Sequence, residues 1–145
     1  IQTTFGWLGY HMHQFSSGRE YYAPPSPYDF DDFAEDYAGL TLADFLQAPK
    51  DKLIYEYDFG DSWEHRIELE KVLPPAGGAT YPRCIKGKRH RPPEDVGGVW
   101  GYEHFLAAIQ DPKHPEHEEL LEWAGGKFDP EAINLREINL RLGVI

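Results

Sequence analysis

The chain has 145 residues, of which 41% are hydrophobic and 14% aromatic, which supplies a packed core and excludes a disordered chain. No apolar run approaches the roughly 20 residues of a membrane-spanning helix, and one cysteine excludes an internal disulfide framework, so we expect a cytoplasmic protein with no membrane contact. The formal net charge of -11 disfavours broad binding to nucleic acids.

The first part of the chain predicts a helix end, a strand and a loop. Residues 1–7 (IQTTFGW) are typical of a helix closed by Gly6, and nothing upstream starts that helix. Residues 11–15 (HMHQF) predict a strand. Its alternation places three side chains on one face: His11, His13 and Phe15. Residues 16–40 are rich in Gly, Pro, Ser, Tyr and Asp, which predicts a long loop or an insertion.

The middle of the chain predicts a short helix followed by a β-hairpin. Residues 41–49 (TLADFLQAP) offer Thr41 as an N-cap and a proline as a stop. Residues 52–59 (KLIYEYDF) and 63–73 (WEHRIELEKVL) alternate between apolar and polar side chains on either side of the turn residues GDS. We therefore expect a hairpin with one buried face and one solvated face.

The last third of the chain predicts helices. Apolar spacing indicates one helix near residues 102–110, and a second begins at Pro115 and ends at Gly125. A last helical segment covers residues 129–142 (DPEAINLREINLRL). Strands come first and helices later, which favours an α+β fold over an alternating α/β fold.

Two long blocks, YEYDFGDSWEHRIELEKV at residues 55–72 and PPEDVGGVWGYEHF at residues 92–105, resemble the plasmid pRiA4b ORF-3-like family. The resemblance covers nearly the whole chain except the variable loop at 16–40. It implies a single α+β domain over residues 1–145, with a curved, mostly antiparallel sheet and packed helices concentrated in the C-terminal third. Members usually begin with a strand and the first half of a helix, and both are missing here.

The family resemblance implies little about activity. Some members carry a resolvase-like label associated with mobile elements. This chain lacks the basic C-terminal helix-turn-helix that a serine resolvase needs. Members also often carry a second cysteine just before the PPED block, where this chain has Arg91, so a thiol-based metal site does not transfer from the family.

Histidines suggest a metal site. The i, i+2 pair His11 and His13 points both imidazoles the same way from a strand, and zinc needs three or four converging N, O or S donors. Further donors are available elsewhere in the chain: His65, Asp58, Asp61 and Cys84. The alternative is that one histidine packs against Phe15 and the other is solvated. No cofactor is otherwise expected.

The hairpin turn also suggests acid/base chemistry. Asp58, Asp61, Glu64 and His65 combine carboxylates with a histidine whose pKa a neighbouring carboxylate would tune. The alternative is structural, because Asp61 and Ser62 are turn formers whose side chains bond the local backbone, and Asp58 is able to accept from the same amides.

Residues 83–91 (RCIKGKRHR) form a local basic run with a charge of +5 and no acid. Its cations are Arg83, Lys86, Lys88, Arg89 and Arg91. The run predicts either a solvated loop or a binding patch for phosphate or an acidic partner. Trp100 and Tyr102, which either fill a core with Phe105 or line a pocket, are assigned to the same candidate patch.

Three functions follow from these patterns. The favoured one is a non-enzymatic module that binds a protein, peptide or other ligand. The second is a metal-dependent or acid/base enzyme that uses His11, His13, Asp58, Asp61 and His65. The third is a mobile-element accessory protein that contacts DNA through residues 83–91. An enzyme is the less favoured reading because no catalytic set is complete.

Overall fold

The computed structural model describes residues 1–25 and 33–143, and its contacts divide the chain into two compact units. Residues 11–76 form the sheet unit, and residues 1–10 with 77–145 form the helical unit. Strands fill the first unit and the longer helices lie in the last third of the chain, so the predicted α+β fold is confirmed. No helix in the described residues has the length and apolarity that would cross a membrane.

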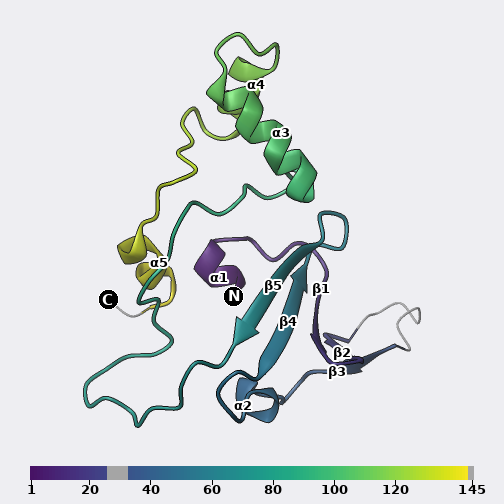
Figure 1. The fold of residues 1–145 in the computed structure, drawn as a ribbon, viewed down its shortest axis with the longest axis vertical. Helices are drawn as coiled ribbons and strands as arrows, with labels where there is room; N and C mark the ends of the chain where they lie inside the picture. Colours follow the sequence, from purple (N-terminus) through teal and green to yellow (C-terminus); the bar gives the residue numbers. More distant parts are fainter. Residues whose placement is uncertain (26–32, 144–145) are drawn as a thin grey trace. The chain divides into compact units, whose positions relative to one another are not determined.

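The sheet unit is built on five strands in the order β3-β2-β1-β4-β5 (Figure 1). The strands are β1 (His13–Ser17), β2 (Glu20–Ala23), β3 (Ala34–Asp36), β4 (Lys52–Tyr57) and β5 (Trp63–Glu68). Every neighbouring pair is antiparallel except β2 and β3, which are parallel. The sheet is thus mostly antiparallel, as predicted, and the parallel pairing of β2 with β3 makes it a mixed sheet.

The predicted hairpin is β4 and β5, paired from Lys52↔Glu68 to Tyr57↔Trp63. Burial alternates along β4, where Leu53, Tyr55 and Tyr57 are each at most 2% exposed. The alternation in the sequence therefore predicts the apolar face of the hairpin correctly. Side chains two residues apart on a strand point to the same side of the sheet, and paired residues on β4 and β5 share that side.

The prediction of a loop over residues 16–40 is wrong for β2 and β3. Tyr21 and Tyr22 supply strand-forming aromatic side chains between turn residues, and β3 has only three residues, too few to show a pattern. Residues 26–32 of that segment lie outside the described residues. The short helix predicted after it is α2 (Leu42–Phe45), where Thr41 N and Thr41 Oγ1 both donate to Asp44 Oδ2 at 2.7 Å.

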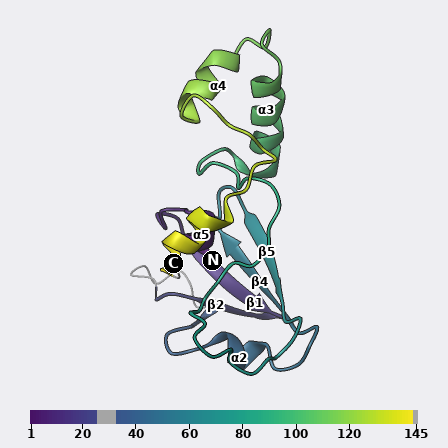
Figure 2. The same cartoon turned by 90° about the vertical axis from the view of Figure 1, so that its left-hand side faces the viewer.

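The helical unit contains α1 (Gln2–Phe5), α3 (Gly98–Gln110), α4 (His117–Trp123) and α5 (Leu135–Arg141). The views in Figures 1 and 2 agree that α3 and α4 lie side by side. Phe105 of α3 is 1% exposed, and its ring contacts Trp123 of α4 and Phe128 beyond it. Arg141 of α5 donates to the carbonyls at the end of α1, Thr3 O and Thr4 O, at 3.2 Å.

Helix boundaries differ from the sequence predictions in three places. α3 begins at Gly98 rather than near residue 102, and α4 begins at His117, two residues after Pro115. The segment predicted from residue 129 becomes helical only at Leu135. Asp129 instead forms a turn with Glu131 N, and Asn134 caps α5 by accepting from Glu137 N. The predicted closure of α1 by Gly6 is confirmed, with φ 69°.

Candidate functional site

The hairpin turn uses Asp58 as a structural residue. Its side chain is 12% exposed, its backbone adopts φ 60°, and its Oδ1 accepts from Gly60 N at 2.9 Å and from Asp61 N at 3.3 Å. Aspartate tolerates this left-handed conformation because its short side chain bonds the local backbone. His11 Nδ1 lies 3.5 Å from Asp58 Oδ2. The carboxylate proposed for acid/base chemistry is therefore already engaged by turn amides.

His13 and His65 lie on the same face of the sheet and both flank the buried Tyr55. His13 Nε2 is 2.9 Å from Tyr37 Oη, and His65 Nδ1 is 3.2 Å from Tyr55 O. Burial lowers the pKa of each imidazole. Both rings are thus biased toward the neutral form and are held among aromatic side chains.

The predicted zinc ligands are spread over both units. His11, His13 and His65 belong to the sheet unit, whereas Cys84 belongs to the helical unit. β1 begins at His13, so His11 precedes the strand on which it was expected. Within the described part of the sheet unit, no three His, Cys, Asp or Glu donor atoms lie within 4.8 Å of one another. A zinc site on these residues stays a prediction.

Residues 83–91, here called the basic segment, form an anchored coil. Cys84 N donates to Asn139 Oδ1 at 2.8 Å, and Asn139 Nδ2 donates to Cys84 O at 2.9 Å. His90 N donates to Pro130 O at 2.9 Å. A Cβ added at Gly87 would lie 2.3 Å from Ile133 Cδ1, so the backbone packs closely there. The segment lacks secondary structure but is held at both ends and in the middle.

Three cations of the basic segment are exposed and uncompensated. Arg83, Lys86 and Lys88 form no ion pair with any residue in 1–25 or 33–143. Arg89 differs, because its Nε lies 3.3 Å from Glu131 Oε1. Arg91 is half-buried and donates from Nη1 to Pro92 O at 3.1 Å. The positive surface is therefore narrower than the five cations of the sequence suggested.

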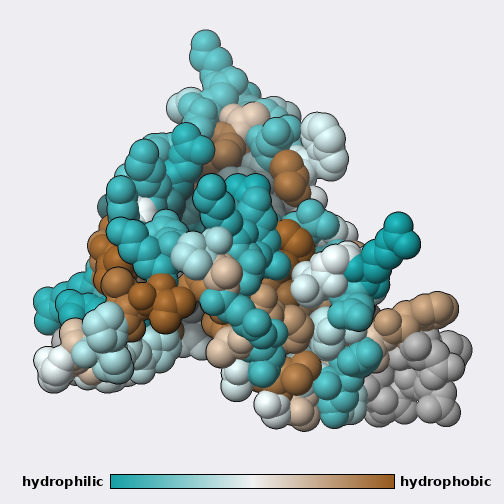
Figure 3. Space-filling model, turned by 60° about the horizontal axis from the view of Figure 1, so that its bottom comes forward, coloured by the Kyte–Doolittle hydropathy of each residue, from teal (hydrophilic) through white to brown (hydrophobic). Residues whose placement is uncertain are grey.

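Large apolar side chains reach the surface within and around this segment. Ile85 is 84% exposed between the cations, and Tyr81, two residues before the segment, is 62% exposed. Trp100, at the start of α3, is 81% exposed. Tyr102 instead stacks near Phe105, and burial raises the pKa of its hydroxyl. Figure 3 shows apolar residues emerging among hydrophilic ones on one face of the molecule.

Sequence reasoning missed the anchor of the basic segment. Asn139 is 9% exposed although it is polar, and the oxygen and the nitrogen of its side-chain amide both bond the Cys84 backbone. A signal was present, because Asn139 stands between Ile138 and Leu140 in a predicted helix, and a buried amide needs hydrogen-bond partners. The partner itself lies 55 residues away, which no local pattern reveals.

Three comparisons place the chain among known proteins. A family model described as plasmid pRiA4b ORF-3-like protein matches residues 1–137. Uncharacterized protein y4hQ of Sinorhizobium fredii is 37% identical over 96% of this chain and 72% of its own. The crystal structure of MM3350, a protein of unknown function from Methanosarcina mazei Go1, superposes with a TM-score of 0.83 and 34% identity over 94% of this chain and 78% of its own. The chain belongs to the plasmid pRiA4b ORF-3-like family.

Proposed function

We propose that the protein is a non-enzymatic interaction module that binds an acidic segment of another protein through the basic segment, residues 83–91. The observation that carries this proposal is one anchored coil in which three exposed cations, none of them in an ion pair with a residue that the structure describes, surround an 84% exposed isoleucine. The chain as a whole carries a net charge of -11. A positive, partly apolar strip on such a chain is a feature that solvation alone does not require.

The anchoring of the basic segment favours binding. Asn139 and Pro130 hold its backbone before any partner arrives. Binding therefore orders few residues, and the entropic cost of association falls because the coil is already in place. The engaged carboxylate of Asp58 favours the same non-enzymatic reading.

The charge distribution of the chain favours an acidic peptide over duplex DNA as the partner. With +5 in the basic segment, the rest of the chain carries -11 - 5 = -16. A peptide contacts only the local strip, and beyond roughly 8 Å at physiological salt the remaining negative charge is screened. A duplex presents phosphates over a wider area and meets more of that charge. Ile85 also offers an apolar contact that phosphates do not use.

The test is fluorescence anisotropy of a labelled peptide that alternates glutamate with leucine, at low and physiological salt. We expect Lys86→Glu with Lys88→Glu to weaken binding roughly tenfold or more, because two attractive charges become repulsive. Ile85→Ser should weaken it about fivefold through lost apolar burial.

A matched control changes the net charge equally elsewhere. Lys71→Glu with Lys127→Glu reverses two exposed lysines outside the basic segment. Binding should survive in this control. Equal losses in both double variants would show only a global charge effect and refute the proposed site. Salt-sensitive retention of duplex DNA, lost in Lys86→Glu with Arg89→Glu, would favour the DNA-contacting accessory function instead.

A further inference from the structure

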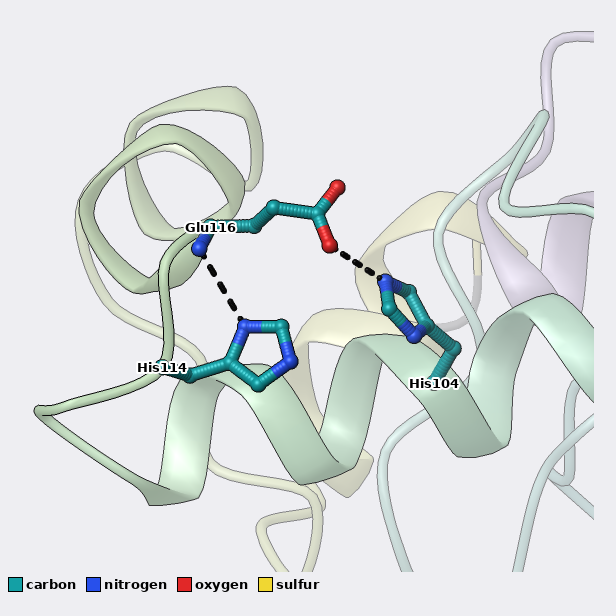
Figure 4. Close-up of side chains that lie close together, drawn as sticks. All are labelled: His104, His114 and Glu116. Carbon is teal, nitrogen blue, oxygen red and sulfur yellow. Dashed lines mark hydrogen bonds and ion pairs between the residues drawn. The ribbon is translucent and has the colours of Figure 1, made fainter.

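Two histidines and a glutamate meet where α3 turns into α4. His104 lies on α3, His114 lies in the connection, and Glu116 is the N-cap of α4. His104 Nε2 lies 2.9 Å from Glu116 Oε2, and the two imidazole rings pack edge to face with centroids 5.5 Å apart. One ligand-type atom from each residue lies within 4.8 Å of the other two (Figure 4). No spacing motif in the sequence predicts this cluster, because its members come together only through the turn between the helices.

The connection is shaped by its own hydrogen bonds. Asp111 accepts from Lys113 N through Oδ1 and from His114 N through its carbonyl, each at 2.9 Å. His117 then joins the helices, because its Nδ1 lies 2.9 Å from the carbonyl oxygen of Ala108 on α3. These contacts fix the path from α3 to α4. They bring together residues that are ten and twelve positions apart.

An exposed His104–Glu116 pair by itself is an ordinary surface interaction worth little to stability. A third donor distinguishes this cluster from such a pair. His114 places a second imidazole beside the pair, so nitrogen and carboxylate oxygen converge from three residues. Glu118 and Glu119 in the first turn of α4 add negative charge nearby, which favours a cation.

We propose that His104, His114 and Glu116 bind a divalent transition-metal ion such as Zn²⁺. Two imidazoles and one carboxylate are a donor set that zinc and related ions use, with bond lengths of about 2.0–2.2 Å. Donors around a tetrahedral ion then lie about 3.4 Å apart. The separation of at most 4.8 Å closes to that value by rotation of side chains, two of which are exposed.

His114 exchanges one hydrogen bond when the ion binds. Its Nδ1 accepts from Glu116 N at 3.2 Å, so the proton of the neutral ring sits on Nε2. A neutral imidazole has one unprotonated nitrogen, and a metal ion needs it. Coordination therefore releases Glu116 N to solvent, where water replaces the lost partner because the residue is exposed.

The site would act as a cross-link between two helices. Its donors come from α3, from the connection and from the N-cap of α4, so a bound ion ties the helices at the turn. Three protein donors leave at least one coordination position, and the exposure of His104 and Glu116 opens it to water or to a ligand from outside. This site is independent of the basic segment and of the function proposed for it.

The experiment is isothermal titration of ZnCl₂ into untagged, chelator-treated protein, together with thermal melting in the presence and absence of Zn²⁺. We expect one bound ion per chain and a higher melting temperature with zinc. His104→Ala and His114→Ala should each weaken binding roughly tenfold or more and remove the thermal shift, since one of three donors is lost.

Glu119→Gln is the matched control, because it removes a neighbouring exposed carboxylate and leaves the three donors. It should bind zinc nearly as wild type does. Circular dichroism of each metal-free variant checks that the fold is kept. Unchanged affinity in both histidine variants would overturn the site. Loss of the bound ion in His13→Ala but not in His114→Ala would also overturn it, by moving the ion to the sheet unit.

Discussion

At the scale of single residues, His13 and His65 make the folding stability of the sheet unit depend on pH. Both rings flank Tyr55, and burial lowers both pKa values below the ordinary 6.5. The unfolded chain, in which each histidine titrates normally, therefore binds more protons near pH 6 than the folded chain does. Folding stability then rises with pH, and the histidine contribution is complete above the unfolded pKa.

We predict that the free energy of unfolding falls as pH drops from about 7 to about 5, because the half-buried rings of His13 and His65 resist protonation. Urea denaturation at several pH values measures this slope. His13→Gln with His65→Gln removes both titrating groups, so the slope should flatten in the double variant. An unchanged slope would assign the pH dependence to other groups.

At the scale of elements, the start of α3 depends on glycine. Gly97, the N-cap of α3, and Gly98, its first residue, adopt φ 92° and 66°. A Cβ on Gly101 would lie 2.0 Å from the carbonyl oxygen of Val96, a backbone atom that cannot rotate away. The chain therefore passes closely over the first turn of α3, which the absence of a side chain at Gly101 permits.

We predict that Gly101→Ala lowers the free energy of unfolding by about 2–4 kcal/mol, because the added methyl group forces the backbone around Val96 to move. Urea denaturation gives the value. Glu103→Ala, an exposed change on the same helix, is the control and should stay within about 0.5 kcal/mol of wild type. A Gly101→Ala protein as stable as that control would contradict the close approach.

The helices and strands differ in how well they could be predicted from the sequence. The β4–β5 hairpin was predictable because six residues alternate on each strand around a turn. β3 was not, because three residues next to β2 carry no period of their own. The late start of α5 reflects Asn134, which caps the helix, whereas Asp129, the first residue of the predicted segment, forms a turn.

Sites were less predictable than elements. The basic segment was visible as a charge run, but its cations divide according to burial and pairing that composition does not show. The cluster of His104, His114 and Glu116 could not be predicted from the sequence, because the turn at Asp111 sets its geometry. A search for donors on either side of a tight helix–helix connection would have found it.

At the scale of the whole molecule, net charge sets the response to salt. A chain of -11 repels itself when compact, and screening weakens that repulsion. We predict that raising NaCl from about 20 to about 200 mM increases the melting temperature by a few degrees, because the screening length shortens severalfold. The same change should weaken peptide binding to the basic segment. Salt would thus act on folding and on binding in opposite directions.

Thermal melts of the Lys71→Glu, Lys127→Glu variant extend this test. Its net charge is -11 - 4 = -15, so its melting temperature should respond more steeply to salt than that of wild type. Equal responses in the two proteins would show that local ion pairs, and not total charge, govern the effect.

The bond between Cys84 and Asn139 has a consequence for the order of events during synthesis. The basic segment leaves the ribosome first, and the residue that holds it follows 55 positions later. Until Asn139 has emerged, the start of the segment at Cys84 lacks the two hydrogen bonds that hold it in the folded chain. The basic segment therefore reaches its fully anchored form, the form that we propose binds a partner, only after nearly the whole of this sequence has been translated.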